Sequence, residues 1–347
     1  MNTNKIQINN KQFKLDDIQQ ILLNSELSQW EQGVYRFMLN WFDKSDFILQ
    51  KTSGSTGNPK EIRLKKSAMK ASAKKTLAFF NLQKGDTALL CLSIDYIAGK
   101  MMVLRALLGG LNLLIVEPNG KPEIPTQAIH FAAMVPMQVQ KLIDAGYDFH
   151  NIKRLIIGGA AVVYNLQQAI EKLPVAVYAS YGMTETCSHI ALQRLNGPNS
   201  DAHFRLLDGV SISTNAQGCL MINAPELYPE PLQTNDLVDI ISPHEFRWLG
   251  RADNVINSGG LKIFPEELEL KISKLIGREC LIVSVPDKLL GQKAVLVLEG
   301  TEENPAIMLD KIKSSIGKHR TPKSVFFVEK FPRNSAMKID RKAIMIS

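Results

Sequence analysis

The chain has 347 residues, of which 45% are hydrophobic and 22% are charged, a balance that excludes a disordered or fibrous protein and predicts two domains. The formal net charge is +7, and residues 251–347 hold +5 of it, with 17 Lys and Arg against 12 Asp and Glu. No cluster of Lys and Arg with interleaved aromatic residues accompanies this excess, which favours small anionic substrates over nucleic acid as partners.

Cysteine usage and the N-terminal sequence indicate a cytoplasmic protein. The four cysteines lie far apart and form no CxxC pair: Cys91, Cys187, Cys219 and Cys280. This spacing argues against a disulfide framework or a zinc finger and fits a reducing compartment. The first residues, MNTNKIQINNKQFK, lack the apolar stretch of a signal peptide, and no apolar run approaches the ~20 residues that a membrane span needs.

Short apolar runs alternate with helical patterns through the first 250 residues. Residues 87–93, 112–118 and 153–160 are expected to form buried strands, and residues 67–82 and 98–110 to form helices. This alternation predicts an α/β architecture with a mostly parallel sheet. Ligands of such sheets bind at the carboxyl ends of the strands, so the loops that follow the strands are expected to share one rim.

The pattern changes in the second half of the chain. Short strands and turns over residues 206–241 predict a small β-rich subdomain, and residues 251–347 read as a compact α+β domain. In that last part FPEELELKISKLIG is expected to be a helix with Pro265 in its first turn. We therefore divide the chain into an N-terminal domain, 1–250, and a C-terminal domain, 251–347.

The segment TSGSTGNPK, residues 52–60, combines backbone freed by glycine with hydroxyl groups and one lysine. Gly54 and Gly57 are only three residues apart, so the segment is not the phosphate loop of P-loop NTPases. It can still wrap a polyphosphate, and a flexible turn is the equally good alternative. The residues expected to contact phosphate are Thr52, Ser53, Gly54, Ser55, Thr56, Gly57 and Lys60.

Three further motifs give only weak evidence for a binding site when each is taken alone. YGMTE, residues 181–185, supplies an aromatic face, a hydroxyl and a carboxylate after an apolar run, or simply a turn with a capping threonine. GGA, residues 158–160, permits close approach of a planar ring, or is plain turn geometry. Asp236 in TNDLVDI can accept both hydroxyls of a ribose, or is a solvated turn residue.

Taken in order, these segments resemble a known family. TSGSTGNPK, GGA, YGMTE, TND, GRADNVINSGG and PRNSAMKIDR are similar to the motifs of adenylate-forming acyl-CoA synthetases, and they cover residues 48–343. Within that family, VPMQVQKLI, LGGLNLLIVEP and YGMTETCSHIAL look most like the o-succinylbenzoate–CoA ligases of menaquinone biosynthesis. The resemblance implies ATP, CoA and a small carboxylic acid as substrates and Mg²⁺ as cofactor.

The resemblance assigns roles to the nucleotide-binding motifs. Residues 52–60 would hold the β- and γ-phosphates, while Gly158, Gly159 and Ala160 flank the adenine. Tyr181 would stack on the adenine beside Gly182, Thr184 would touch the α-phosphate, and Glu185 would hold Mg²⁺. Asp236 would bind the ribose hydroxyls with help from Arg251.

In the C-terminal part, the resemblance implies a mobile domain that supplies different residues to the two half-reactions. Lys338 would reach the bond that forms between the carboxylate and the α-phosphorus. Asp253 would be the hinge, and the strand with Gly259 and Gly260 would line the pantetheine tunnel.

Three departures from the family pattern concern the substrate side. Only 51 residues precede the phosphate segment, so we expect a shortened N-terminal part and an acid pocket that is more open or completed by a second copy in a homodimer. Asp95 and Tyr96 replace an aromatic–histidine pair, and Met337 replaces a glycine before the lysine. A dicarboxylic aromatic acid needs a cation or donors away from its reacting end. The candidates are Tyr96, Lys100, Arg105, His189 and Gln193, and each is equally well read as a surface residue.

Other functions stay open at this point. Another aryl- or acyl-CoA ligase would share every ATP motif, and a carrier-protein-loading enzyme would lack activity with free CoA. A non-catalytic nucleotide-binding protein would not need Lys338, Glu185 and Asp236 together.

Overall fold

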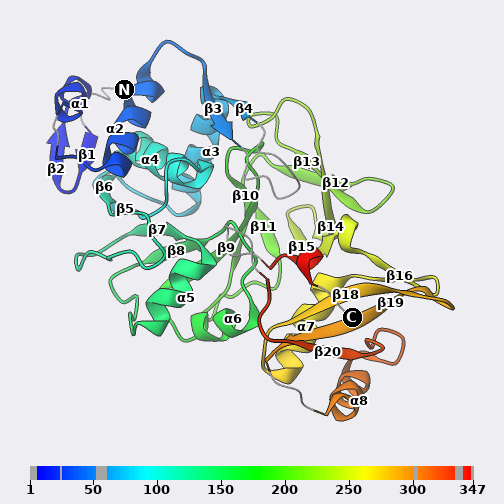
Figure 1. Cartoon of the computed structure of the whole chain (residues 1–347). Helices are drawn as coiled ribbons and strands as arrows, with labels where there is room; N and C mark the ends of the chain where they lie inside the picture. The colour runs from blue at the N-terminus through cyan, green and yellow to red at the C-terminus, as the bar shows by residue number, and fades with distance from the viewer. Residues whose placement is uncertain (1–5, 24–25, 52–60, 301–303, 333–338, 345–347) are drawn as a thin grey trace.

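The computed structural model describes residues 6–23, 26–51, 61–300, 304–332 and 339–344. Its largest element is a sheet of 13 strands in the order β12-β13-β14-β15-β11-β10-β9-β8-β7-β5-β6-β1-β2 (Figure 1). The strands are β1 (Ile6–Ile8), β2 (Lys11–Phe13), β5 (Thr87–Leu90), β6 (Asn112–Ile115), β7 (Phe131–Met134), β8 (Arg154–Ile157), β9 (Ala176–Gly182), β10 (His189–Arg194), β11 (Phe204–Leu206), β12 (Ser211–Thr214), β13 (Cys219–Asn223), β14 (Leu232–Ser242) and β15 (Glu245–Arg251).

One half of this sheet is parallel. β1, β6, β5, β7, β8 and β9 run in the same direction, as the continuous apolar runs of the sequence predict. All four residues of β6 and of β7 are buried, because both faces of these strands are covered. The α/β class is confirmed.

The other half of the sheet is antiparallel, which corrects the expectation of a mostly parallel sheet. From β9 onward each strand pairs antiparallel with its neighbour through β10, β11, β15, β14, β13 and β12. The large sheet is therefore mixed rather than mostly parallel, and the β-rich residues 206–241 lie in its antiparallel part. The hairpins β12–β13 and β14–β15, whose strands are joined by short turns, contribute to this antiparallel part because a short turn returns the chain alongside the strand before it.

Helices cover both faces of the parallel strands. Neighbouring strand residues alternate between two hydrophobic clusters: Leu90 belongs to the cluster with Met69 and Met101, and Leu89 to the cluster with Val139. The first cluster involves α2 (Gln29–Phe42), α3 (Lys66–Phe79) and α4 (Ile97–Gly109), and the second involves α5 (Pro136–Asp144) and α6 (Tyr164–Ile170). α1 (Leu15–Ile21) packs on α2 near the N-terminal end. Among the described residues, no helix combines the length and apolar character needed to cross a membrane.

A separate hairpin flanks the first helices. β3 (Phe47–Lys51) and β4 (Glu61–Lys65) pair only with each other, and residues 52–60 connect them. Gln50 of β3 is buried and ties the hairpin to the loop before α4, because its Nε2 donates 2.8 Å to the carbonyl oxygen of Asp95. The base of the expected phosphate segment is thus fixed to the rim of the large sheet.

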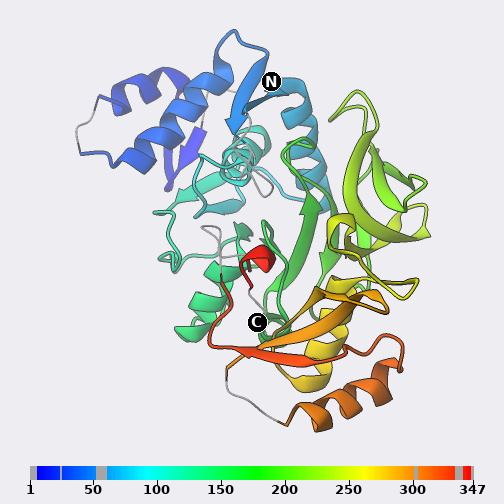
Figure 2. The same ribbon diagram turned by 45° about the vertical axis from the view of Figure 1, so that its right-hand side comes forward.

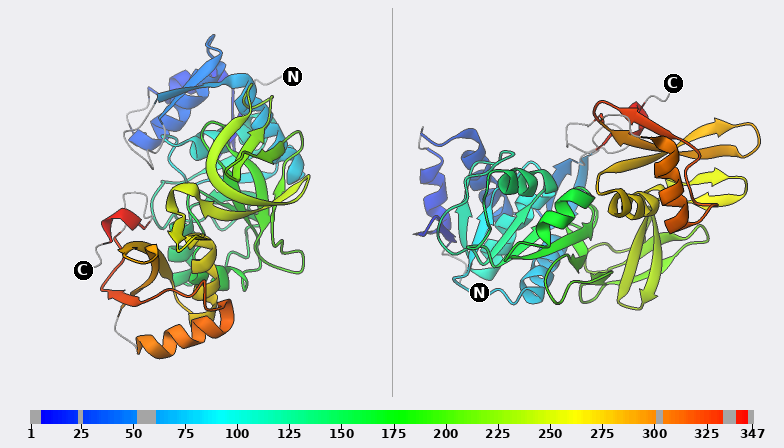
Figure 3. Two further views of the ribbon diagram at one scale, coloured as in Figure 1. Left: turned by 90° about the vertical axis from the view of Figure 1, so that its right-hand side faces the viewer. Right: turned by 90° about the horizontal axis from the view of Figure 1, so that it is seen from below.

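The strands β16 to β20 form a second sheet, and the described residues between 256 and 344 have hydrophobic clusters of their own. The elements of this part are β16 (Ile256–Ser258), β17 (Leu261–Ile263), α7 (Pro265–Ile276), β18 (Cys280–Asp287), β19 (Gly291–Glu299), α8 (Pro305–Ile316) and β20 (Val325–Val328). As predicted, α7 begins at Pro265. This sheet lies beside the large sheet rather than within it (Figures 2 and 3). The short 3₁₀ helices η1 (Ala252–Asn254) and η2 (Arg341–Ala343) lie before β16 and near the C-terminal end.

A largely buried ion pair ties Arg341 to α7. The Arg341 guanidinium donates 2.6 Å to Glu269 Oε1 and 2.5 Å to Oε2, a bidentate geometry, and Oε1 also accepts the backbone N–H of Ile282 at 2.7 Å. Burial raises the pKa of Glu269 in spite of this partner. The pair therefore fixes η2 directly after the motif that carries Lys338.

We expect Arg341→Met to destabilise the C-terminal sheet by about 3 kcal/mol, because it leaves the Glu269 carboxylate buried without its counter-charge. Hydrogen exchange of the β18 and β19 amides measures this loss. Arg247→Met is the matched control, since the pair between Arg247 and Asp239 is about half exposed and contributes at most about 1 kcal/mol. Equal losses in the two variants would contradict the account.

Candidate active site

The carboxyl ends of β5, β7, β8 and β9 lie at one edge of the large sheet, because these strands are parallel neighbours. The residues that follow them include Ser93, Val135, Gly158 and Thr184. The rim expected from the sequence is therefore present, and it brings together loops from four separate parts of the chain (Figure 2).

Two of the predicted nucleotide residues meet directly. Tyr181, at the end of β9, donates its hydroxyl to Asp236 Oδ2 of β14 at 2.7 Å although 55 residues separate them. The Tyr181 ring packs edge-on against Phe246, with ring centroids 5.1 Å apart. Burial, the charge of Asp236 and this hydrogen bond raise the pKa of Tyr181, so its hydroxyl remains a donor.

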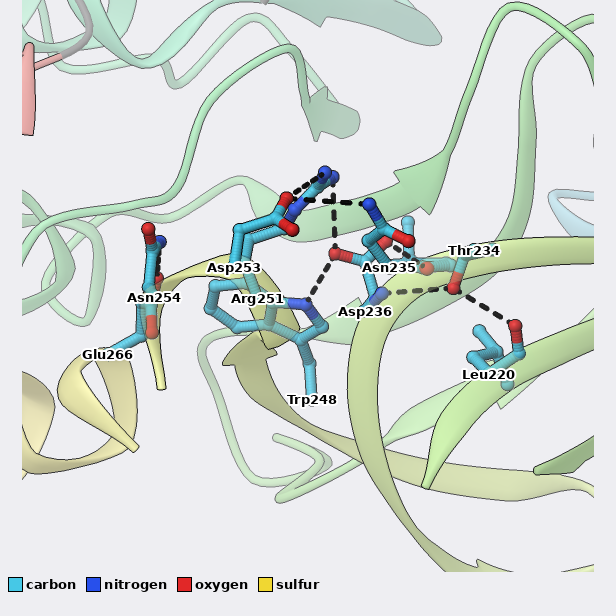
Figure 4. Close-up of polar contacts among 10 residues, drawn as sticks. Leu220, Thr234, Asn235, Asp236, Trp248, Arg251, Asp253, Asn254 and Glu266 are labelled. Atoms are coloured by element: carbon cyan, nitrogen blue, oxygen red, sulfur yellow. Dashed lines mark hydrogen bonds and ion pairs between the residues drawn. The ribbon is translucent and has the colours of Figure 1, made fainter. Parts of the chain in front are cut away.

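The carboxylate of Asp236 is oriented by three groups, of which Figure 4 labels Trp248 and Arg251. Besides Tyr181, Trp248 Nε1 donates to Oδ1 at 3.3 Å and Arg251 Nη1 lies 3.6 Å from the same oxygen. Arg251 stands opposite Asp236 in the β14–β15 register, as its expected helper role requires. Trp248 was not predicted as a site residue from the sequence. A predicted hairpin that pairs Asp236 with Arg251 would have placed Trp248 close to Asp236.

The glycines after β8 have a structural explanation of their own. A Cβ at Gly158 would stand 2.4 Å from Ser180 Oγ, so the missing side chain makes room for β9. Gly159 has a φ of +83°, which favours glycine in a turn. Ala160 follows in the same loop. These residues lie on the rim beside β9, and contact with a planar ring stays a prediction.

The turn after β9 is tight. A Cβ at Gly182 would stand 2.3 Å from the carbonyl oxygen of Ser188, so only glycine lets the turn close onto β10. Thr184 accepts the backbone N–H of Cys187 through its carbonyl, and its hydroxyl has no hydrogen-bond partner among the described residues. Glu185 is half-buried and likewise has no such partner. A single free carboxylate is enough to hold Mg²⁺ at such a site, because this ion takes its other ligands from phosphate and water.

Three of the five acid-pocket candidates have other partners or lie apart. Lys100 Nζ donates 2.6 Å to Gln50 Oε1 and thereby braces the β3–β4 hairpin, and burial lowers its pKa. Gln193 Nε2 donates 3.0 Å to the carbonyl oxygen of Asp201, away from the β9–β10 turn. Tyr96 is 60% exposed at the start of α4.

The other two candidates come together. Arg105 of α4 is only 2% exposed, and its Nη2 donates 2.7 Å to the hydroxyl of Ser188, which lies 3.3 Å from Nδ1 of the buried His189. Arg105 Nε is buried without any hydrogen-bond partner, and no carboxylate among the described residues forms an ion pair with this guanidinium. Burial lowers the pKa of Arg105 to about 9, so it remains charged at neutral pH. Ser188 was not anticipated from the sequence.

The expected hinge residue lies in the link between the two sheets, and the expected tunnel residues lie in the second sheet. Asp253 is exposed in η1, where it accepts hydrogen bonds from Asn235 and Arg251 (Figure 4). Gly259 and Gly260 form the turn between β16 and β17 with φ angles of +57° and +82°. The expectation that they lie in a strand is wrong: a hairpin turn with two positive φ angles needs them there.

Some predicted site residues lie outside the described part of the chain. These are Thr52, Ser53, Gly54, Ser55, Thr56, Gly57 and Lys60 of the phosphate segment and Lys338 with its neighbour Met337.

Comparison with known proteins settles the family. A family model described as AMP-binding enzyme matches residues 7–217 of this chain. The chain belongs to this family. A solved acyl-CoA synthetase (AMP-forming)/AMP-acid ligase II-like protein from Dyadobacter fermentans is 36% identical, with a TM-score of 0.64 over 92% of this chain and 95% of that one.

Several relatives carry one enzyme name. The 2-succinylbenzoate–CoA ligase of Lactococcus lactis is 23% identical over 87% of this AMP-binding enzyme and 71% of the relative, and that of Staphylococcus epidermidis is 26% identical over 92% and 73%. The o-succinylbenzoate CoA synthetase of Bacillus subtilis, solved in complex with its acyl-adenylate intermediate, has a TM-score of 0.71 at 20% identity. It covers 86% of this chain and 69% of its own, a likeness of fold.

The buried imidazole of His189 predicts a pH dependence of stability. Burial and the nearby Arg105 charge hold the pKa of His189 well below its ordinary value of 6.5. Below pH 6.5 the unfolded chain therefore takes up a proton that the folded protein does not, so stability is full above pH 6.5 and falls as the pH drops below it. His189→Gln is expected to remove up to about 1.4 kcal/mol of this loss per pH unit.

Urea unfolding at pH 7.5 and pH 5.5 measures the effect. His244→Gln, at an exposed histidine, is the control and should unfold with the pH dependence of the unmodified protein. A His189→Gln variant with that same dependence would show that the imidazole is not held neutral.

Proposed function

We propose that this AMP-binding enzyme is an ATP-dependent acid–CoA ligase whose acid is o-succinylbenzoate. In the first half-reaction a substrate carboxylate oxygen attacks the α-phosphorus of ATP, and the bond to the β-phosphate oxygen breaks to release diphosphate. In the second, the thiolate of CoA attacks the acyl carbon and AMP leaves with the carboxyl oxygen. The single observation that carries the choice of acid is the buried Arg105 charge without a described carboxylate partner.

The rim supplies groups that suit the first half-reaction. Tyr181 and Trp248 donate hydrogen bonds to the Asp236 carboxylate but occupy only part of its lone pairs. The remaining lone pairs can accept hydrogen bonds from two ribose hydroxyls. Thr184 would meet the α-phosphate, and Glu185 would hold Mg²⁺, which neutralises phosphate charge as the leaving group departs. Residues 52–60 would hold the diphosphate end, joined to the rim by the bond from Gln50 to Asp95.

The Arg105 environment suits a second carboxylate on the acid. An isolated buried charge costs several kcal/mol, and a guanidinium meets a carboxylate through two parallel N–H donors. Arg105 has one nitrogen held by Ser188, and its Nε has no hydrogen-bond partner in the part of the chain that the structure describes. A dicarboxylic acid would place its non-reacting carboxylate there, whereas benzoate, a fatty acid or an amino acid with an uncharged side chain has no such group.

The second half-reaction assigns a role to the C-terminal part. We propose that residues 1–250 and 251–347 are separate domains and that the second rotates about Asp253, withdrawing Lys338 and bringing the turn at Gly259 and Gly260 to the pantetheine arm. The separate hydrophobic clusters of residues 256–344 support such a division. We further propose a cytoplasmic enzyme that acts on small molecules rather than nucleic acid, with a homodimer as its assembly.

ATP- and CoA-dependent turnover of a substrate panel tests the function. We expect release of AMP and diphosphate with o-succinylbenzoate and little with benzoate, a medium-chain fatty acid or an amino acid. Arg105→Met should raise KM for o-succinylbenzoate by about 10- to 100-fold, since a hydrogen bond to a charged group contributes roughly 1.5–3 kcal/mol. KM for the monoacid that lacks the non-reacting carboxylate should not change.

Thermal unfolding separates this effect from misfolding. Arg105→Met removes a buried charge that has no described counter-charge, so its Tm should equal or exceed that of the unmodified protein. Arg36→Met, at an exposed arginine of α2, is the matched control for KM. Turnover of benzoate in preference to o-succinylbenzoate would refute the choice of acid, and adenylate formation without use of free CoA would indicate a carrier-loading enzyme.

Lys338→Ala tests the division of labour between the half-reactions. Because the lysine would act only on the α-phosphorus, the variant should lose ATP–diphosphate exchange yet make thioester from supplied acyl adenylate and CoA. Lys330→Ala, at an exposed lysine of the same part, should retain both activities. Equal loss of the two half-reactions would contradict the domain rotation.

A further inference from the structure

The polar side chains behind Arg105 form a continuous chain of hydrogen bonds through the interior. Arg105 Nη2 donates to Ser188 Oγ at 2.7 Å, and that oxygen lies 3.3 Å from His189 Nδ1. On the far side of the ring, His189 Nε2 lies 3.2 Å from Thr76 Oγ1, which lies 3.3 Å from the carbonyl oxygen of Ser72. The chain thus links α4, the β9–β10 turn and α3.

One placement of protons satisfies all of these groups. Arg105 only donates, so Ser188 Oγ accepts from it and keeps its own hydrogen for His189 Nδ1. The neutral imidazole then carries its hydrogen on Nε2 and donates it to Thr76, which donates its hydroxyl to the Ser72 carbonyl. In the opposite tautomer, the Ser188 hydroxyl hydrogen would have no acceptor among the described residues.

Burial and charge favour the same placement. Thr76 is fully buried and His189 is 6% exposed, so water does not compete for these groups. The Arg105 cation beyond Ser188 disfavours a hydrogen on the near nitrogen, and together with burial it keeps the pKa of His189 low and the ring neutral. Hydrogen bonds in such a line polarise one another in the same direction.

We propose that Thr76 and His189 are positioning residues that hold the Ser188 hydroxyl in place for Arg105. With Nη2 fixed by Ser188, the guanidinium plane is fixed and its remaining N–H groups are aimed at the second carboxylate of the acid. His189 therefore acts through Ser188 and does not touch the substrate. For its effect on the acid, this inference rests on the proposed function.

The local fold explains why these residues come together. The missing Cβ of Gly182 lets β9 approach β10 at Ser188 and His189, which places the ring against α3. Thr76 faces it from the buried side of α3, one turn after Ser72. The Ser72 hydroxyl has no hydrogen-bond partner within the described ranges, so the backbone carbonyl of Ser72 is the group that takes part in the chain.

Thr76→Val and Thr76→Ser test the proposal as a pair. The valine removes the acceptor of His189 Nε2 and should raise KM for o-succinylbenzoate about five-fold, the size expected of one neutral hydrogen bond. KM for the monoacid lacking the non-reacting carboxylate, and kcat for both acids, should not change. Thr76→Ser keeps the hydroxyl and should restore the original KM, and Ser72→Ala should have no effect.

Nitrogen NMR of the His189 ring supplies a readout that needs no substrate. The free protein should carry the ring hydrogen on Nε2, and Thr76→Val should shift the population toward Nδ1–H while Thr76→Ser does not. A ring hydrogen on Nδ1 in the unmodified protein, or an equal KM change for both acids in Thr76→Val, would overturn the proposal. If o-succinylbenzoate is not a substrate, the proposed function fails, whereas the tautomer measurement still decides the hydrogen-bond chain.

Discussion

The constraint on which the site depends is the burial of a guanidinium that has no described carboxylate partner. Arg105 stands on α4 between α3 and the β9–β10 turn, 2% exposed, with Ser188 as its one oxygen partner. A buried charge of this kind is costly in the free protein and becomes favourable when an anion arrives. In the function that we propose, this burial of Arg105 favours an acid with a second carboxylate.

The fold supplies this constraint through close packing at a few points. Gly182 allows the turn that presents Ser188 to α4, and Gly99 allows α4 to approach the loop before it, since a Cβ there would lie 2.3 Å from the carbonyl oxygen of Ser93. Lys100 follows Gly99 on the same helix, and its Nζ donates a hydrogen bond to Gln50 in the β3–β4 hairpin. One helix thus contacts both the β9–β10 turn and the β3–β4 hairpin.

Much of this arrangement could be predicted from the sequence, and the failures have physical causes. Apolar runs followed by glycine loops predicted the parallel strands and their common rim, because parallel strands buried on both faces leave that signature. Tyr181 and Asp236 were both expected at the nucleotide, and they share a hydrogen bond. The antiparallel half of the sheet was missed because short strands do not reveal which neighbours they pair with.

Side-chain direction was harder to predict than position along the chain. Lys100 and Arg105 lie on the same helix, five residues apart, yet contact Gln50 and Ser188 in different parts of the molecule. The roles of Thr76 and Ser188 depend on contacts between α3 and β10, and no local pattern encodes such long-range contacts. From the sequence, Gly259 and Gly260 were assigned to the pantetheine tunnel because they lack side chains. In the structure, the positive φ angles of the hairpin turn explain why glycine occupies both positions.

The most direct test of the account is a crystal structure of the enzyme with a non-hydrolysable o-succinylbenzoyl-adenylate analogue. The account predicts that the free carboxylate of the acyl group lies within hydrogen-bond distance of Arg105 Nε, with Ser188 still bound to Nη2 and the nucleoside beside Tyr181 and Asp236. A free carboxylate that lies elsewhere, with Arg105 still without an anionic partner, would contradict it.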